Sequence, residues 1–263
     1  MTLGFLDQPV ALWPPILLAF LGGLGTWALT LLGTLPVLFL RTVPRRLMDF
    51  MMGAAGGIMV AAACWSLLVP ALETGGVFRA LAGLLLGAAT LWGMDQVVPH
   101  LHPEFPTEAH EEGPRVAWRR SALLMAAITI HNFPEGLAVG LGLGGGDLTR
   151  GLALAIGIGI QNIPEGLAIA MPLRRDGMRR GRAFFYGQLS AVVEPFAAIL
   201  GAWFVTAAAA ALPYGLAFAA GAMLYVVVEE LLPETTRSGN PDVATIGFIG
   251  GFALMMALDQ LGG

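Results

Sequence analysis

The sequence has few charged residues of either sign, and none of its basic residues is lysine. Charged residues make up 12% and hydrophobic residues 56% of the 263 positions, whereas soluble domains have about 25% charged and about 45–50% apolar residues. A water-soluble core cannot bury this much apolar surface, which excludes a soluble globular protein. The single cysteine, Cys64, excludes an internal disulfide bond. No segment alternates apolar and polar residues, which excludes a membrane β-barrel.

Eight apolar runs are long enough to cross a bilayer as helices, since a hydrocarbon core about 30 Å thick requires about 20 apolar residues per span. The first run lacks the basic start of a secretory signal, so we take it as a span. We therefore predict an all-α membrane protein, one domain over 1–263, with eight transmembrane helices. They lie at about 10–40, 50–70, 77–98, 121–143, 151–172, 184–211, 214–232 and 243–262.

The arginines are unequally divided between the connections on the two sides of the membrane. With both termini outside, only Arg79 and Arg150 lie in outer connections. Because basic residues concentrate in cytoplasmic loops, this division predicts outside termini and an even number of spans. The basic run at 174–182 then marks the membrane surface and is not a nucleic-acid patch. The inner arginines are Arg41, Arg45, Arg46, Arg115, Arg119, Arg120, Arg174, Arg175, Arg179, Arg180, Arg182 and Arg237.

Spans two and three resemble spans seven and eight. GGIMVAAACWSLLVPALE and LWGMDQ are echoed by AGAMLYVVVEELLPE and MMALDQ, so Met59 matches Met223 and Asp95 matches Asp259. An odd number of spans separates the copies, which must therefore cross the membrane in opposite directions. This pattern predicts an inverted repeat of spans 1–3 and 6–8 around spans 4 and 5, a 3+2+3 plan typical of secondary transporters.

One motif occurs twice inside the predicted membrane helices. HNFPEGLAVGLG at 131–142 returns as QNIPEGLAIAMP at 161–172. Asn132 and Asn162 precede the glutamate of each copy by three residues. The proline displaces a backbone carbonyl, and the glycine after the glutamate lets a neighbouring helix approach closely. The doubled motif predicts two kinked helices that meet.

Each copy presents a pair of ligand-type side chains on one helix face. His131 and Glu135 are four residues apart, as are Gln161 and Glu165, so each pair stacks one above the other. A third carboxylate, Glu194, lies in the sixth span. Each buried charge costs on the order of 2.5 kcal/mol or more in lipid, so we expect a divalent cation among them. Oxygen ligands alone suit calcium or magnesium, while an imidazole among them favours zinc, iron, manganese, cobalt or nickel.

HNFPEG, QNIPEG, the SAVVEP segment and the 3+2+3 plan resemble the ZIP metal transporters, in particular their bacterial GufA-like branch. The resemblance implies movement of zinc, or of iron, cadmium or manganese, into the cytoplasm through a two-metal site. It implies His131, Glu135, Gln161 and Glu165 around one metal, with Met59 as a soft ligand. It implies Asn132, Asn162 and Glu194 around a second metal, with bridging help from Glu135 and Glu165.

Further polar residues are candidates for the entrance or exit of the metal. Where relatives often carry His-Glu in the seventh span, this chain has Glu229 and Glu230, which are either an exit step or ordinary glutamates at a helix end. Asp259 and Glu73 are entrance candidates or ordinary interfacial residues. A polar loop at about 99–120 is predicted to be a cytoplasmic metal acceptor or a solvated linker, and it contains His100, His102 and His110.

Two other functions compete with metal uptake. A cation exchanger or proton-coupled antiporter also uses inverted repeats with Asn and Glu beside proline, although His131 argues against selectivity for hard ions. An intramembrane metalloprotease would need two histidines one turn apart with a glutamate between them, and only one histidine lies in any span. We therefore predict a non-enzymatic transporter of a bacterial inner membrane, with metal ions and lipid as partners, no nucleic acid, and a homodimer as one possible assembly.

Overall fold

The computed structural model describes residues 13–97, 100–101, 111–112, 120–237 and 239–262. Apart from one antiparallel pair of two-residue strands, β1 (His100–Leu101) and β2 (Glu111–Glu112), the regular structure of these residues is helical. The predicted all-α class is confirmed. The first half contains α1 (Pro15–Thr34), η2 (Leu35–Leu38), α2 (Arg45–Ala61), η3 (Ala62–Leu68), α3 (Val69–Val97) and α4 (Arg120–Gly144). The second half contains α5 (Leu148–Arg175), α6 (Arg180–Leu189), η5 (Ser190–Val192), α7 (Val193–Ala207), η6 (Ala209–Ala211), α8 (Leu212–Val226), η7 (Val227–Leu231), α9 (Leu232–Arg237) and α10 (Pro241–Gly262).

Six helical segments within the described residues are long and apolar enough to cross a membrane. One of them, Arg45–Val97, has 53 residues, which at 1.5 Å per residue gives about 80 Å, far more than one bilayer crossing. Its backbone leaves the helical conformation at Gly76, with φ 74° and ψ 171°. Because a positive φ is accessible mainly to glycine, Gly76 lets the chain reverse between α2 and the main part of α3. The 25-residue α4 is not among the six.

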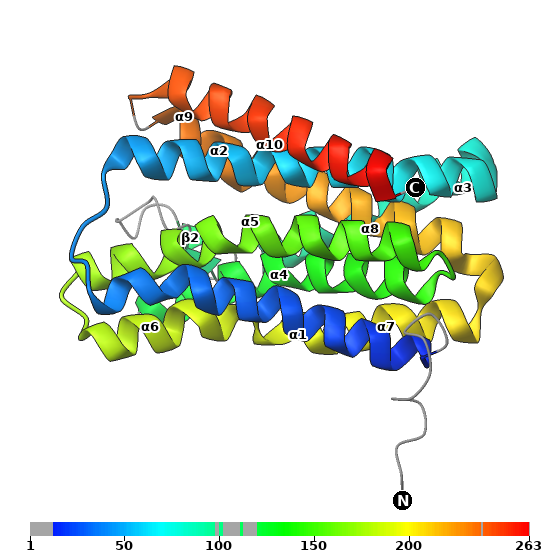
Figure 1. Cartoon of the computed structure of the whole chain (residues 1–263), viewed down its shortest axis with the longest axis horizontal. Helices are drawn as coiled ribbons and strands as arrows, with labels where there is room; N and C mark the ends of the chain where they lie inside the picture. Colours follow the sequence, from blue (N-terminus) through cyan, green and yellow to red (C-terminus); the bar gives the residue numbers. More distant parts are fainter. Residues whose placement is uncertain (1–12, 98–99, 102–110, 113–119, 238, 263) are drawn as a thin grey trace, which may run out of the picture.

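The helices form two groups (Figure 1). In the first, α2 packs along α10 and α3 packs along α8. In the second, α4 packs along α7, and α1 packs along both α5 and α7. The groups meet mainly where α2 and α10 contact α5 and where α4 contacts α8. The two halves of the doubled motif, on α4 and α5, therefore lie where the second group faces the first.

Glycine allows the close packing of the helices inside the first group. A Cβ on Gly57 or Gly251 would collide with the backbone of α10 or α2, respectively. A Cβ on Gly87 or Gly221 would likewise collide with the backbone of α8 or α3. Lipid tails supply no hydrophobic force between helices, so such backbone approaches and the dispersion contacts they permit hold the pairs together.

The two matched segments of the sequence repeat share an unusual local feature. Ala62–Leu68 and Val227–Leu231 are both π-helical, and each ends two residues before a proline, Pro70 or Pro233. Proline removes a backbone donor and displaces the carbonyl four residues earlier, which accounts for a widened turn at this place. The sequence repeat matched Met59 with Met223, but it did not indicate that a helical turn is widened in both segments.

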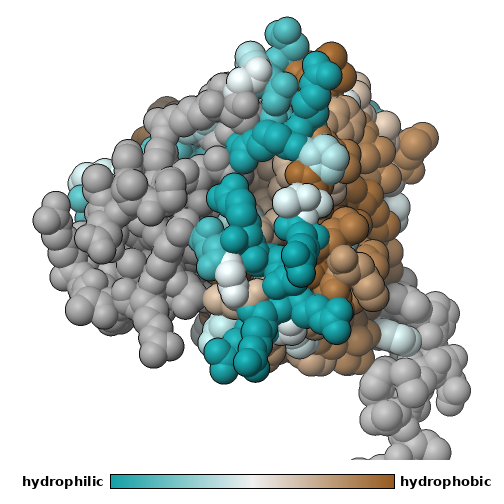
Figure 2. All heavy atoms as spheres, turned by 90° about the vertical axis from the view of Figure 1, so that its left-hand side faces the viewer, coloured by the Kyte–Doolittle hydropathy of each residue, from teal (hydrophilic) through white to brown (hydrophobic). Residues whose placement is uncertain are grey.

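The described arginines separate between the two ends of the helices (Figure 1). Arg79 and Arg150 belong to the end at which α1 begins and α10 ends. Figure 2 looks onto the opposite end and shows a column of hydrophilic residues beside a hydrophobic face. The arginines in segments at this basic end are Arg41, Arg45, Arg46, Arg120, Arg174, Arg175, Arg179, Arg180, Arg182 and Arg237.

Replacement of Gly251 by leucine is expected to destabilise the protein, because the new side chain must enter the backbone of α2 at Ala54. Overpacking of this kind typically costs about 1–3 kcal/mol. The matched control is Gly250→Leu on the same helix, where a Cβ meets nothing within 4 Å. Thermal unfolding in detergent should show a lower midpoint for Gly251→Leu only. Equal midpoints for the two variants would contradict the close contact between α2 and α10.

Candidate metal centre

The doubled motif forms a buried polar cluster where α4, α5 and α7 meet. Both helices continue through the motif prolines, Pro134 and Pro164, which lie inside helical segments. The three carboxylates of the cluster are almost inaccessible: Glu135 and Glu194 are 0% exposed and Glu165 is 6% exposed. The predicted meeting of the polar faces of α4 and α5 is therefore present in the structure.

The imidazole of His131 lies between the two motif glutamates. Its Nε2 atom is 3.6 Å from an oxygen of Glu135 and 3.6 Å from an oxygen of Glu165. One ligand atom from each of these three side chains lies within 4.8 Å of the other two. Gln161 completes this side of the cluster, since its Nε2 donates to Glu135 Oε1 at 2.5 Å.

These separations fit a metal better than they fit hydrogen bonds. A distance of 3.6 Å is too long for a side-chain hydrogen bond. Around a tetrahedral zinc ion, with Zn–N and Zn–O distances of about 2.0–2.2 Å, neighbouring ligand atoms lie about 3.3–3.6 Å apart. The spacing of His131 Nε2 from Glu135 and Glu165 matches the upper end of that range.

Several buried atoms of the cluster have no hydrogen-bond partner among the residues that the structure describes. Buried polar atoms in proteins are nearly always partnered, so each exception requires an explanation. A bound cation would accept a lone pair from the imidazole nitrogen and from each carboxylate or amide oxygen. It would therefore explain why these atoms have no hydrogen-bond partner. The atoms without a partner are His131 Nε2, Asn132 Nδ2, Glu135 Oε2, Gln161 Oε1, Asn162 Oδ1 and Glu165 Oε1.

Glu194 has a different environment. Asn162 Nδ2 lies 3.0 Å from each oxygen of Glu194 and 3.3 Å from the carbonyl oxygen of Thr26. A neutral amide therefore partners this carboxylate, whereas Glu135 and Glu165 face an imidazole. The contact with Thr26 on α1 was not predicted, because a backbone carbonyl leaves no signal in the sequence.

The motif glycines bring the helix backbones together, as the sequence predicted. A Cβ on Gly136 would lie 2.5 Å from the carbonyl oxygen and 2.6 Å from the Cα of Glu194. A Cβ on Gly166 would collide with the Thr30 carbonyl of α1. The absence of a side chain at these two positions lets α4 approach α7 and lets α5 approach α1. The polar side chains one residue earlier can then converge.

One residue from the other helix group joins the cluster. Glu230 of η7 places Oε2 3.6 Å from His131 Nδ1, so both imidazole nitrogens face carboxylates. The sequence did not distinguish Glu229 from Glu230. In the structure Glu229 is exposed, and Glu230 is the one that lies against His131. Met59 of α2 is 0% exposed, and Asn132 is also buried.

Asp259 and Glu73 have partners outside this cluster. Asp259 is buried and accepts a hydrogen bond from Ser66 at 2.7 Å. Ser66 belongs to no sequence motif, so this partner was not predicted. Glu73 is exposed and lies 3.8 Å from Arg150. Asp95 is buried in α3. His102 and His110 lie outside the described residues, and for His100 only the backbone of β1 is described.

Similarity to known proteins extends over most of the chain. The family profile described as ZIP Zinc transporter matches residues 106–259. The chain is 40% identical to the zinc transporter ZIP11 of Homo sapiens, over 92% of this chain and 96% of that protein. It is 41% identical to the zinc transporter ZIPB of Bordetella bronchiseptica, over 92% of this chain and 80% of that protein. It is 39% identical to the zinc transporter GufA of Myxococcus xanthus, over 87% of this chain and 92% of that protein.

Replacement of Glu165 by glutamine is expected to weaken zinc binding about ten-fold or more, because it removes a charged ligand while keeping the side chain's shape. The control is Asp242→Asn, at an exposed carboxylate in the first turn of α10. Isothermal titration of the detergent-solubilised proteins measures both affinities. Unchanged zinc affinity in a folded Glu165→Gln protein would remove Glu165 from the centre.

Proposed function

The chain belongs to the ZIP family of zinc transporters, and we propose that it carries divalent transition-metal ions, above all zinc, into the cytoplasm through the centre on α4, α5 and α7. The family assignment agrees with the one predicted from the sequence and identifies a transporter, not an enzyme. The relatives' names designate zinc transporters, which supports zinc as the main substrate.

The observation that carries the proposal is the group of His131, Glu135 and Glu165, buried together with unpartnered ligand atoms. A divalent cation offsets the repulsion between the carboxylates and restores ligand bonds to their unpartnered oxygens. The imidazole directs the choice toward zinc and related metals, away from calcium and magnesium. Met59, on a neighbouring helix and fully buried, is proposed as a soft ligand on the same side of the site.

A second, weaker metal position is proposed beside Glu194, with oxygens of Asn132 and Asn162 as its other ligands. In this arrangement Asn162 would turn its oxygen toward the ion, giving up the two contacts that it makes with Glu194. The amide contributes a dipole but no charge, and the lost contacts oppose binding. Glu135 and Glu165 would bridge the two positions.

We propose eight spans in the 3+2+3 arrangement, in one domain with both termini outside, in a bacterial inner membrane. The break at Gly76 divides Arg45–Val97 into spans two and three, and α4 supplies span four. The basic end described above would face the cytoplasm, in accordance with the positive-inside rule. Assembly as a homodimer is compatible with this arrangement.

The route through the membrane is proposed to begin near Asp259 and Glu73 and to end near Glu230. Ser66 belongs to the π-helical turn of η3, and its hydroxyl donates a buried hydrogen bond to Asp259 near the end of α10. Glu230, whose carboxylate lies beside Nδ1 of His131, would accept the ion as it leaves Glu135 and Glu165. The loop histidines, His100, His102 and His110, would receive it afterwards, with Glu229 near the exit.

Transport by the purified protein in liposomes tests this function. Zinc should enter vesicles loaded with a zinc-sensitive dye, and His131→Ala should reduce the rate about ten-fold or more at low zinc, because an imidazole ligand is lost. Serine at His100, His102 and His110 together should change the rate only modestly. Iron, manganese and cadmium should compete with zinc. Transport of sodium or calcium without competition from these metals would instead favour a cation exchanger.

Asn162→Asp should strengthen the second metal position, since it replaces a neutral oxygen ligand with a charged one. Two binding steps of unequal affinity are expected in the parent protein, and the weaker one should tighten about ten-fold in the variant. Calorimetric titration with zinc measures both steps. Two equal steps in the parent protein, or an unchanged weaker step in the variant, would contradict the assignment of Asn162.

A further inference from the structure

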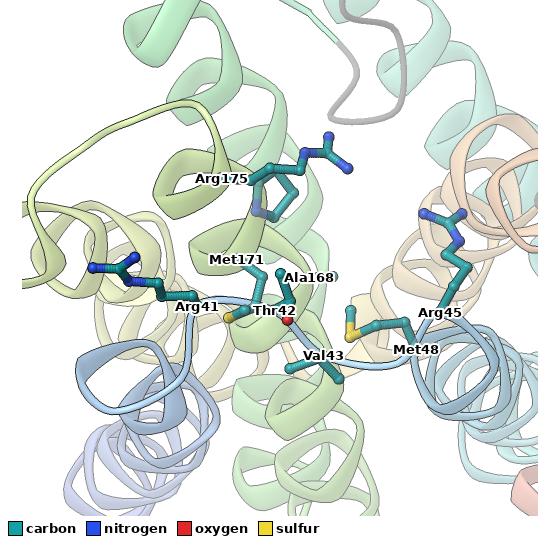
Figure 3. A pocket seen from close by; sticks show the side chains of 9 residues that line it. Arg41, Thr42, Val43, Arg45, Met48, Ala168, Met171 and Arg175 are labelled. Atoms are coloured by element: carbon teal, nitrogen blue, oxygen red, sulfur yellow. The ribbon is translucent and has the colours of Figure 1, made fainter.

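Two adjoining cavities open at the basic end of the molecule, between the α1–α2 connection and the end of α5 (Figure 3). Their volumes are about 220 Å³ and about 330 Å³. They adjoin at Arg41, Thr42 and Arg175, which line both, and we refer to the two together as the hollow. None of the residues in this hollow belongs to the metal centre.

The polar part of the hollow is positively charged. The larger cavity is lined by three arginines and Thr42, and no acidic side chain from the described part of the chain lines either cavity. Arg45 pairs with Asp49 at 2.9 Å and Arg175 lies 3.9 Å from Asp176, whereas no acidic group of the described residues pairs with Arg41. Figure 3 shows Arg41 and Arg45 on opposite sides of the pocket, with Arg175 above and between them. A cation is repelled by this lining, so the hollow is separate from the metal route.

The other part of the hollow is apolar. Its lining consists of Val43, Met48, Ala168, Met171 and Pro172. Figure 3 shows Met48 and Met171 close to Thr42 and Val43, between the arginines. A ligand that uses both parts must therefore combine an anionic group with an adjoining apolar portion.

The hollow lies beside side chains suited to lipid. Phe39 is 81% exposed and directly precedes Leu40 and Arg41, and Phe50 on α2 is also exposed. Figure 2 shows hydrophilic residues of this end directly beside a hydrophobic face. An apolar side chain next to an arginine is the pattern of a membrane surface, where hydrocarbon meets the headgroups.

We propose that this hollow binds an acidic phospholipid, with its phosphate between Arg41 and Arg175 and its glycerol and first acyl carbons over Met48 and Met171. Guanidinium groups recognise phosphate oxygens through paired hydrogen bonds. Basic pockets between transmembrane helices are known to accept anionic headgroups. The apolar lining selects lipid over free phosphate, since inorganic phosphate gains nothing from it.

A lipid in this position contacts both helix groups. Met48 and Arg45 belong to α2, while Ala168, Met171 and Arg175 belong to α5. Because α2 and α5 belong to different groups, the bound lipid should stabilise the arrangement seen in this structure. The assignment requires only that the hollow lie at a membrane surface, so its test is independent of metal transport.

The test compares two double variants with equal loss of charge. Arg41→Gln with Arg175→Gln removes two arginines that line both cavities. Arg46→Gln with Arg182→Gln removes two exposed arginines of the same end that line neither cavity. Binding of phosphatidylglycerol to purified protein in neutral detergent is measured by native mass spectrometry, and stabilisation is measured by thermal unfolding. Phosphatidylcholine serves as the zwitterionic reference.

The parent protein should bind phosphatidylglycerol in preference to phosphatidylcholine and unfold at a higher temperature in its presence. The pocket variant should lose affinity about ten-fold or more, and the control variant less than about three-fold. Equal losses in the two variants would show diffuse surface attraction and overturn the proposal. Displacement of the lipid by an equal concentration of inorganic phosphate would show a site for free anions, and would also overturn it.

Discussion

Three carboxylates in the middle of a membrane protein, at Glu135, Glu165 and Glu194, are the constraint on which the rest of this structure depends. Each charge at this depth is costly in hydrocarbon, on the order of 2.5–3.5 kcal/mol. All three are 6% exposed or less, so water does not offset the cost. The protein meets it in two ways: an imidazole between two of the carboxylates, and a neutral amide against the third. The unpartnered atoms beside His131 leave the first of these incomplete, and the proposed divalent cation would complete it.

The helical framework serves this arrangement. Glycine at 136 and 166 lets neighbouring backbones come into contact around the cluster. Proline at 134 and 164 lies one residue before each motif glutamate, inside a continuous helix. Most of the site belongs to one helix group, while Glu230 reaches it from the other. The close contact between the groups at His131 thus couples ligand geometry to helix packing.

Sequence reasoning predicted the helical class, the motif residues and their convergence, because helix periodicity and buried charge are both visible in a sequence. It could not distinguish Glu229 from Glu230, since their neighbourhood depends on the π-helical turn of η7. It missed the hydrogen bond from Ser66 to Asp259, which joins residues far apart in the chain. It also missed the hydrogen bond that Asn162 donates to Glu194. An asparagine amide can donate or accept, and the sequence does not show which of the two it does.

The location of bound zinc is the measurement that bears most directly on this account. Crystals of the protein grown with zinc, and measured on both sides of the zinc absorption edge, would give an anomalous difference map that places the ion without reference to the protein coordinates. We expect the strongest peak among His131 Nε2, Glu135 and Glu165, at about 2.0–2.2 Å from each ligand atom. A strongest peak away from these three residues, with the cluster empty, would contradict the account.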